Sequence, residues 1–310
     1  MTILQHTNLN TILTVIYTFV DDFIKNVVHS VRFALTRPKQ YAPPTRKHNL
    51  SIAELTSLAI FKFFTEHKSW KGFYEFIKTY HHQDFPHLPT YQNFLSSVNQ
   101  LSAMAMMFLK GFMHVFKQHT AITEAKFADS TKLEVCHIKR EFSHKVTKDF
   151  AQKSKGSMGW FYGFKLHIIA NELMQILGFT ITPANVDDRK GLQLIWKDIF
   201  GMIIADAGYL GKDIAQKASE LGKILLAGVR TNMKKLMTAT QYHLLKMRQK
   251  VEMIFSVLKM RMGLETSLPR SPLGHFAHYI WCITAYQLKK FLEFAQTKPL
   301  ILSTKTPSFA

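Results

Sequence analysis

The sequence predicts an α/β protein in which a mixed five-stranded sheet flanked by helices follows an all-helical N-terminal domain. Three observations support this fold class. Up to about residue 118 every regular pattern is helical, whereas strand patterns begin at Ile122. Residues Tyr162–Ala170 alternate with a period of two, which is typical of a strand. The apolar segment that ends at Asp206 is flanked by helical patterns, as buried parallel strands usually are.

The N-terminal part shows one linker and several helices. Residues Thr36–His48 hold three prolines and four Lys or Arg, so we expect a basic, Pro-rich linker at 36–48. Ser51 and Glu54 have the spacing of a capping box, which predicts the start of an apolar helix. Two more helices are expected, at Trp70–Tyr80 and Thr90–Phe116. These elements form a helical domain over 1–118.

The rest of the chain alternates between strands and helices. Strands are expected at Glu124–Thr131, Tyr162–Ala170, Ile176–Ala184, Gly201–Asp206 and Lys223–Gly228, and helices at Gly191–Phe200, Lys212–Leu221, Ala239–Met262 and Leu273–Ala295. The alternation predicts a second domain over 119–296, followed by a C-terminal tail at 297–310.

The large positive charge of the chain predicts an anionic partner. The 310 residues include 40 Lys and Arg against 21 Asp and Glu, a formal net charge of +19. Because such an excess repels itself, nucleic acid, an anionic membrane or an acidic protein is a more natural partner than a small metabolite.

The two cysteines, Cys136 and Cys282, are too few for a disulfide framework or a four-Cys zinc site, which favours a reducing compartment. The N-terminus lacks a signal-peptide pattern, and no apolar run approaches the ~18 residues of a membrane span. We therefore expect a cytoplasmic protein with no membrane partner.

Three acids stand in a pattern that suggests metal chemistry. Asp129 and Asp206 end two apolar strands, although either one alone is more readily explained as a turn residue. Glu252 is the only acid in a basic helix, where 100° per residue places Arg248, Glu252 and Lys259 on one stripe beside the buried face. The alternative is an ordinary surface pair of Arg248 and Glu252 with an unrelated lysine. Taken together, the three acids suit two Mg²⁺ ions that assist in-line phosphoryl transfer.

These motifs resemble those of a known family. The segments FADST around Asp129 and IIADAGYLGK around Asp206, with the R-x3-E-x6-K spacing from Arg248 to Lys259, are similar to the DDE transposases of bacterial insertion sequences. DSTKLEVC, YGFKLH and TPANVDD add to the likeness, which is close to the insertion-sequence family numbered nine-eight-two. The family signature has a tyrosine three residues before the arginine; Leu245 stands there, with Tyr242 one turn earlier.

The resemblance implies an RNase H-like catalytic domain with Asp129, Asp206 and Glu252 as catalytic and metal-binding residues. Asp129 would lie on the first, central strand, Asp206 just after the fourth strand, and Glu252 on the following long helix. The implied reaction is hydrolysis at the element's ends followed by attack of the 3′-hydroxyls on target DNA, with Mg²⁺ or Mn²⁺, two ions, as cofactor. The implied partners are terminal inverted repeats, bound by the helical domain, and target DNA, with a homodimer pairing two ends in the nucleoid.

Basic residues are expected to contact the DNA. The segments from Lys132 to Lys165 and from Arg230 to Arg261 each hold eight Lys or Arg, against three acids and one acid. The predicted DNA contacts are Arg248, Lys259, Lys165, His167, Lys250, Arg230, Lys234 and Lys235. Lys165 and His167 are expected on one strand face near Asp129, but they fit equally well as a solvent-facing pair on a half-exposed sheet. We expect Trp160 to pack beside its strand rather than to enter an unstacked base step.

Rival functions share much of this pattern. A structure-selective nuclease or resolvase that cuts without joining needs the same carboxylates and a similar basic surface. A non-catalytic DNA-binding relative needs only the basic surface, and a membrane-surface protein would need a basic amphipathic helix that the sequence does not suggest.

Overall fold

The structure, a computed structural model, describes residues 8–31, 49–156, 159–228, 238–265 and 269–297. The chain divides into two units, the first made of Met1–Phe108, Met262–Ser267 and Leu273–Ala310, and the second of Leu109–Arg261 and Leu268–Pro272. The first unit therefore includes the last long helix, which the sequence grouped with the sheet. The boundaries of the functional domains stay a prediction, and the linker expected at 36–48 lies outside the described residues.

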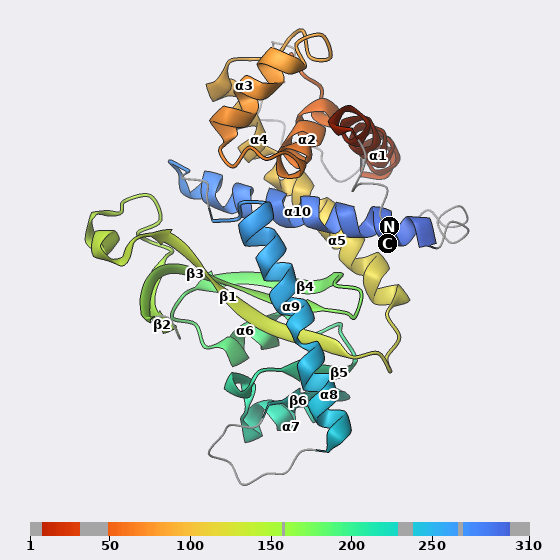
Figure 1. The fold of residues 1–310 in the computed structure, drawn as a ribbon, viewed down its shortest axis with the longest axis vertical. Helices are drawn as coiled ribbons and strands as arrows, with labels where there is room; N and C mark the ends of the chain where they lie inside the picture. Colours follow the sequence, from red (N-terminus) through yellow and green to blue (C-terminus); the bar gives the residue numbers. More distant parts are fainter. Residues whose placement is uncertain (1–7, 32–48, 157–158, 229–237, 266–268, 298–310) are drawn as a thin grey trace. The chain divides into compact units, whose positions relative to one another are not determined.

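The second unit is built on a six-stranded mixed sheet (Figure 1). Its strands are β1 (Lys126–Cys136), β2 (Gln152–Gly156), β3 (Gly159–Ala170), β4 (Ile176–Pro183), β5 (Gly201–Ala205) and β6 (Lys223–Ala227). Strand β1 pairs antiparallel with β3 and parallel with β5, which pairs parallel with β6. The predicted mixed α/β fold is confirmed. The prediction missed β2 because its sequence, QKSKG, is polar and mostly exposed and so shows no apolar alternation.

Strand β3 is long enough to hold two partners on one edge. Tyr162 and Gly163 pair with both β1 and β2, so these two strands must lie on opposite edges of β3. Strand β4 pairs with β3 from Phe164 onward, also opposite β1, so β2 and β4 share an edge end to end. The β2–β3 hairpin consequently extends the sheet past the end of β4.

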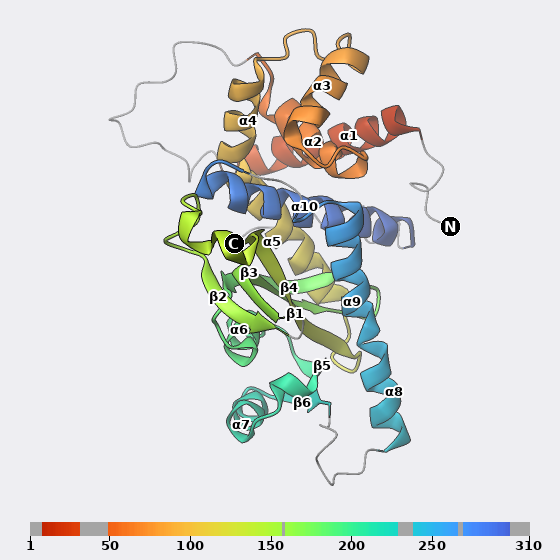
Figure 2. The same cartoon turned by 60° about the vertical axis from the view of Figure 1, so that its left-hand side comes forward.

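The two faces of the sheet carry different helices. Asp129 stands directly opposite Ile168, so its side chain shares a face with the even-numbered residues of β3. Helix α9 (Gln249–Ser256) covers this face and crosses β1 in Figure 1. Helix α6 (Asp188–Ile195) lies on the other face, where a Cβ on Gly191 would come within 2.3 Å of the His167 ring. Helix α7 (Lys212–Glu220) packs on β6 (Figure 2).

The predicted helix over 239–262 is broken into three parts. Helix α8 (Ala239–Met247) ends at Arg248, α9 follows, and a π-helix, η5, covers Val257–Arg261. The prediction of one continuous helix was therefore wrong, because the apolar period alone does not reveal a change of hydrogen-bond spacing.

The first unit contains helices α1 (Leu9–Val31), α2 (Ile52–Phe61), α3 (Trp70–Tyr80), α4 (Tyr91–Gln100), most of α10 (Pro272–Thr297) and the first residues of α5 (Ser102–His119). The capping box of α2 forms as predicted, with Glu54 N donating to Ser51 Oγ at 3.1 Å and Ser51 N donating to Glu54 Oε2 at 2.6 Å. The single helix expected at Thr90–Phe116 is instead α4 and α5, separated at Leu101.

The core of this first unit is aromatic. Trp281 of α10 is fully buried and donates from Nε1 to the carbonyl of Val98 at 3.0 Å. Lys62 is buried among the same helices, with Nζ 4.3 Å from the centre of the Phe63 ring and 5.5 Å from that of Trp70. No helix in the described ranges is long and apolar enough to cross a membrane.

Candidate active site

The three predicted acids come from three elements of the second unit. Asp129 lies in β1 with its side chain 18 % exposed, Asp206 follows β5 directly, and Glu252 lies in α9 with its side chain 52 % exposed. Phe127 pairs with Ile204 in the parallel β1–β5 ladder. Asp129 and Asp206 each stand two residues beyond this pair, and so at the same level of neighbouring strands. Asp206 follows the fifth strand in the sequence, rather than the expected fourth, because β2 was missed.

Strand β1 does not end near its acid. The sequence predicted a short strand within Glu124–Thr131 that ends at Asp129, whereas β1 continues to Cys136. The strand stays paired with β3 beyond Asp129, and burial alternates from Leu133 to Cys136. Asp129 therefore lies inside a strand, while Asp206 follows the end of one.

Arg248 joins two of these acids. Its Nη1 donates to Asp129 Oδ2 at 2.5 Å, and its Nη2 donates to Glu252 Oε1 at 2.8 Å. The pair of Arg248 and Glu252 is the i,i+4 contact that helix geometry predicted. The contact with Asp129 joins residues 119 positions apart. An ordinary surface pair of Arg248 and Glu252 would have no such partner on the sheet.

Burial and the neighbouring charges shift the pKa of the Asp129 carboxyl group. Burial raises the pKa of its carboxyl to about 6, and the negative charges of Asp206 and Glu252 act in the same direction. The Arg248 guanidinium and the backbone N–H of Ser130, 2.8 Å from Asp129 Oδ1, oppose this rise. Asp206 and Glu252 therefore both lie within electrostatic reach of Asp129.

The oxygen atoms of the three carboxylates are suitable ligands for a hard divalent cation. Three carboxylates and one guanidinium leave a formal charge of −2, and carboxylate oxygens are the ligands that Mg²⁺ prefers. Among the described residues, no three His, Cys, Asp or Glu side chains are placed to hold a metal ion. The positive charge between Asp129 and Glu252 is supplied by Arg248.

A second carboxylate network lies beside Asp129. Asp188 Oδ1 accepts from Ser130 Oγ at 2.8 Å and from Lys165 Nζ at 3.0 Å, so one oxygen holds both residues. Ser130 in turn contacts Asp129 through its backbone N–H. Sequence reasoning noticed TPANVDD only as a family likeness and did not select Asp188. The signal for it was a pair of acids at the start of a short helix that follows a strand.

Tyr209 also belongs to this region and was missed. Its side chain is 3 % exposed, and burial together with the charges of Asp129, Asp188 and Asp206 raises the pKa of its hydroxyl. Tyr209 is the last residue of the short 3-10 helix η4 (Ala207–Tyr209), and a single tyrosine at such a position has no distinctive sequence pattern.

Two predicted DNA contacts lie on the other side of the sheet. Lys165 and His167 share a strand face as expected, but it is the face opposite the Asp129 side chain. His167 is 1 % exposed, its Nε2 lies 2.9 Å from Thr182 Oγ1, and burial lowers its pKa to about 4. Lys165 Nζ also donates to the carbonyl of Val186 at 3.0 Å. Neither side chain is placed as the solvent-facing pair that the sequence allowed.

The helix residues expected to contact DNA lie along β1. Lys259 Nζ donates to the carbonyl of Lys132 at 2.5 Å, and Lys250 Nζ lies 6.0 Å from the centre of the Phe127 ring. Tyr242 is exposed. The remaining predicted contacts lie outside the described residues: Arg230, Lys234 and Lys235.

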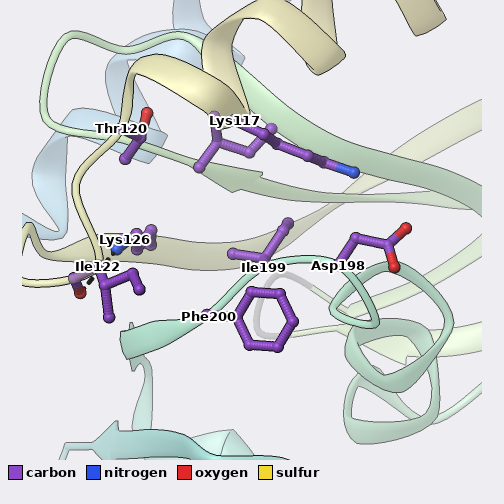
Figure 3. A pocket seen from close by; sticks show the side chains of 8 residues that line it. Lys117, Thr120, Ile122, Lys126, Asp198, Ile199 and Phe200 are labelled. Atoms are coloured by element: carbon purple, nitrogen blue, oxygen red, sulfur yellow. Dashed lines mark hydrogen bonds between the residues drawn. The ribbon is translucent and has the colours of Figure 1, made fainter.

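A pocket lies at the start of β1 (Figure 3), away from the three predicted acids. Lys126, which lines it, is 2 % exposed, and its Nζ donates to the carbonyls of Ala121, Ile122 and Glu124 at 2.7–3.0 Å. None of the three predicted acids lines this pocket.

Comparison with known proteins adds a family match. Residues 119–272 match the family model described as the transposase DDE domain, a range that includes all three acids. The comparison with solved structures finds the cryo-EM structure of the piggyBac transposase synaptic complex with hairpin DNA. It is 9 % identical, and the match covers 94 % of this chain and 77 % of that chain with a TM-score of 0.49. No curated protein sequence matches this chain.

Proposed function

We propose that this chain, which belongs to the DDE transposases, uses Asp129, Asp206 and Glu252 to cleave the ends of an insertion sequence and to join them to target DNA. Enzymes of this family bind DNA and depend on divalent metal ions. The observation that carries the proposal is the Arg248 bridge between Asp129 and Glu252, beside an Asp206 that stands level with Asp129. The electrostatic effect of Asp206 and Glu252 on Asp129 also supports a site shared by three acids that lie far apart in the sequence.

The cofactor we propose is a pair of Mg²⁺ or Mn²⁺ ions held by Asp129, Asp206 and Glu252. When bound, such ions polarise the phosphoryl group and stabilise the attacking and leaving oxygens. The charge of −2 left by the three acids and Arg248 balances one divalent ion, and the phosphates of bound DNA would supply negative charge for the second.

The protein's own residues position the DNA strand. Arg248 lies among the carboxylates, where its Nη1 and Nη2 donate to Asp129 and Glu252, and its guanidinium would exchange these contacts for a phosphate oxygen of the DNA. Lys250 of α9 and Lys259 of η5 supply point charges along β1. Asp188 orients Ser130, and through it Asp129, while Lys165 compensates the charge of Asp188. This assigns Lys165 and His167 to the interior rather than to the DNA surface.

The DNA substrates we propose are terminal inverted repeats and target DNA, bound by a homodimer in the cytoplasm, at the nucleoid. Pairing two ends requires two active sites, which is the reason for the dimer. The net charge of +19 supports a polyanionic partner.

The test is an assay of Mg²⁺-dependent cleavage and joining on DNA that carries the gene's own flanking repeats. Asp129→Asn, Asp206→Asn and Glu252→Gln should each abolish both products. Asp213→Asn, which changes an exposed acid of α7, should leave them unchanged. If one of the three site variants keeps wild-type cleavage, that acid is not part of the catalytic set. Cleavage without any joined product would instead identify a nuclease or resolvase.

A further inference from the structure

One part of the second unit carries exposed aromatic rings among basic side chains. We define the hairpin arm as residues 137–156 together with Gly159–Tyr162; it comprises the 3-10 helix η3 (Ile138–Ser143), β2 and the start of β3. In Figure 1 its yellow-green segment projects beyond the end of the sheet. Phe142 is 93 % exposed, Trp160 is 57 % exposed and Phe150 is 48 % exposed.

Trp160 does not pack beside its strand as the sequence suggested. The other three tryptophans of the chain, Trp70, Trp196 and Trp281, are at most 6 % exposed. Lys153 Nζ lies 5.6 Å from the centre of the Trp160 ring, and Lys155 stands directly opposite Trp160 on β2. An indole held open to solvent beside two lysines is the combination that nucleic-acid grooves use for stacking and phosphate contacts.

The Trp160 side chain of the hairpin arm lies on the same face of the sheet as the Asp129 side chain. Alternation along β3 places Trp160 on the face of Ile168, which is also the face of the Asp129 side chain. Eight residues separate Trp160 from Ile168, a span of about 27 Å at ~3.4 Å per residue. On a DNA duplex this corresponds to roughly eight base pairs from the reacting phosphate.

The charge of the arm fits a polyanion. Residues 137–156 contain six Lys or Arg, all of them exposed, against Glu141 and Asp149. Lys153 Nζ lies 2.9 Å from the Glu141 carboxylate, a contact that it would exchange for a DNA phosphate, and the six cations still exceed the two acids by four. The free face of the arm is therefore basic as well as aromatic.

We propose that the hairpin arm binds duplex DNA roughly eight base pairs from the phosphate that reacts at Asp129, with Lys153 and Lys155 on phosphates and the Trp160 ring against the DNA between them. The proposal deepens the transposase function above and rests on it. It adds a second anchoring point, which sets the direction in which a duplex runs away from the catalytic acids.

The direct test is acrylamide quenching of tryptophan fluorescence, because Trp160 is the exposed tryptophan. We use full-length protein and a duplex that carries one terminal repeat of the element. DNA should protect the wild-type signal, and Trp160→Phe should remove both the quenchable component and its protection. A duplex of scrambled sequence distinguishes target-type DNA from the element's end. Protection by either duplex supports the arm, and protection by the repeat alone assigns it to the element's end.

The position of the arm is tested by the length of the duplex. Duplexes that extend only about four base pairs from the cleavage site should bind without protecting Trp160, whereas duplexes of about twelve should protect it. Protection that does not depend on length would overturn the assignment.

The lysines are tested by the salt dependence of binding. Lys153→Ala with Lys155→Ala should reduce the slope of log affinity against log salt by about two, since each phosphate contact contributes about one. Lys190→Ala, on α6 at the opposite face of the sheet, is the matched control and should leave the slope unchanged.

These outcomes separate the arm from the catalytic proposal. If DNA binds and is cleaved while the quenching of Trp160 does not change, the arm is excluded and the catalytic acids stand. If Trp160 becomes protected without DNA as protein concentration rises, the surface is an interface between copies of the chain and the proposal is wrong. If the Asp129, Asp206 and Glu252 variants cleave normally, the catalytic assignment fails whatever the quenching shows.

Discussion

Lys62 lies in the core of the first unit without a hydrogen-bond partner for Nζ among the described residues, and its replacement by methionine should stabilise the protein. The side chain is 1 % exposed, and burial lowers its pKa from 10.5 to about 8. Methionine keeps a similar length and adds no charge. The Lys62→Met variant therefore removes a buried ammonium while it preserves most of the packing.

The expected gain comes from the linkage between protonation and folding. A folded pKa of about 8 against 10.5 in the unfolded chain corresponds to about 3 kcal/mol of destabilisation at pH 7. Contacts with the Phe63 and Trp70 rings offset about 0.5–2 kcal/mol of this cost, so we expect a gain of about 1–3 kcal/mol.

The same linkage sets the pH dependence. Between pH 8 and 10.5 the unfolded chain binds more protons at Lys62 than the folded chain does, so wild-type stability rises with pH relative to the variant. The advantage of Lys62→Met should be largest below pH 8 and shrink towards pH 10.5.

Urea unfolding followed by tryptophan fluorescence at pH 7, 8.5 and 9.5 measures this difference. Lys71→Met, at an exposed position of α3, is the control and should change stability by less than about 0.5 kcal/mol. A Lys62→Met protein that is less stable at pH 7, or whose advantage does not change with pH, would refute the reasoning.

Three further predictions concern the second unit. Asp188→Asn should lower cleavage about tenfold while leaving the protein folded, because the amide still accepts from the serine hydroxyl but loses the carboxylate charge; turnover and circular dichroism check this. Metal-dependent cleavage should fall as the pH drops below about 6, because protonated Asp129 no longer binds a cation and stays neutral below its folded pKa; a pH profile that is flat down to pH 5 would contradict it. Gly191→Ala should cost about 1–3 kcal/mol in urea unfolding, since its Cβ would lie 2.3 Å from the His167 ring, whereas Gly208→Ala meets nothing within 4 Å and should be nearly neutral.

Local patterns in the sequence were enough for most elements and for the choice of the three acids. The capping box of Ser51 and the helix at Trp70–Tyr80 depend on neighbours within four residues, and both form as predicted. The alternation of Tyr162–Ala170 likewise identified most of β3. Asp129 and Asp206 were selected because each ends an apolar run, a property also visible within a few residues.

Local patterns failed where the backbone changes its hydrogen bonding without a change in composition. The break at Leu101 and the π-helix at Val257–Arg261 keep the apolar spacing of a continuous helix, so periodicity did not reveal them. Strand β2 was missed for the opposite reason, because its pairing with β3 holds a polar segment in the sheet.

The sequence by itself determined that the chain alternates strands and helices, that two acids end apolar runs, and that a third stands in a basic helix. The tertiary structure decided which of these residues meet. It joined Arg248 to Asp129 across 119 positions, buried His167 under α6, and left Trp160 in solvent on the face of Asp129. The physical reason is that helical and strand periods relate residues a few positions apart, whereas contacts between elements depend on strand order and on the face that each side chain occupies.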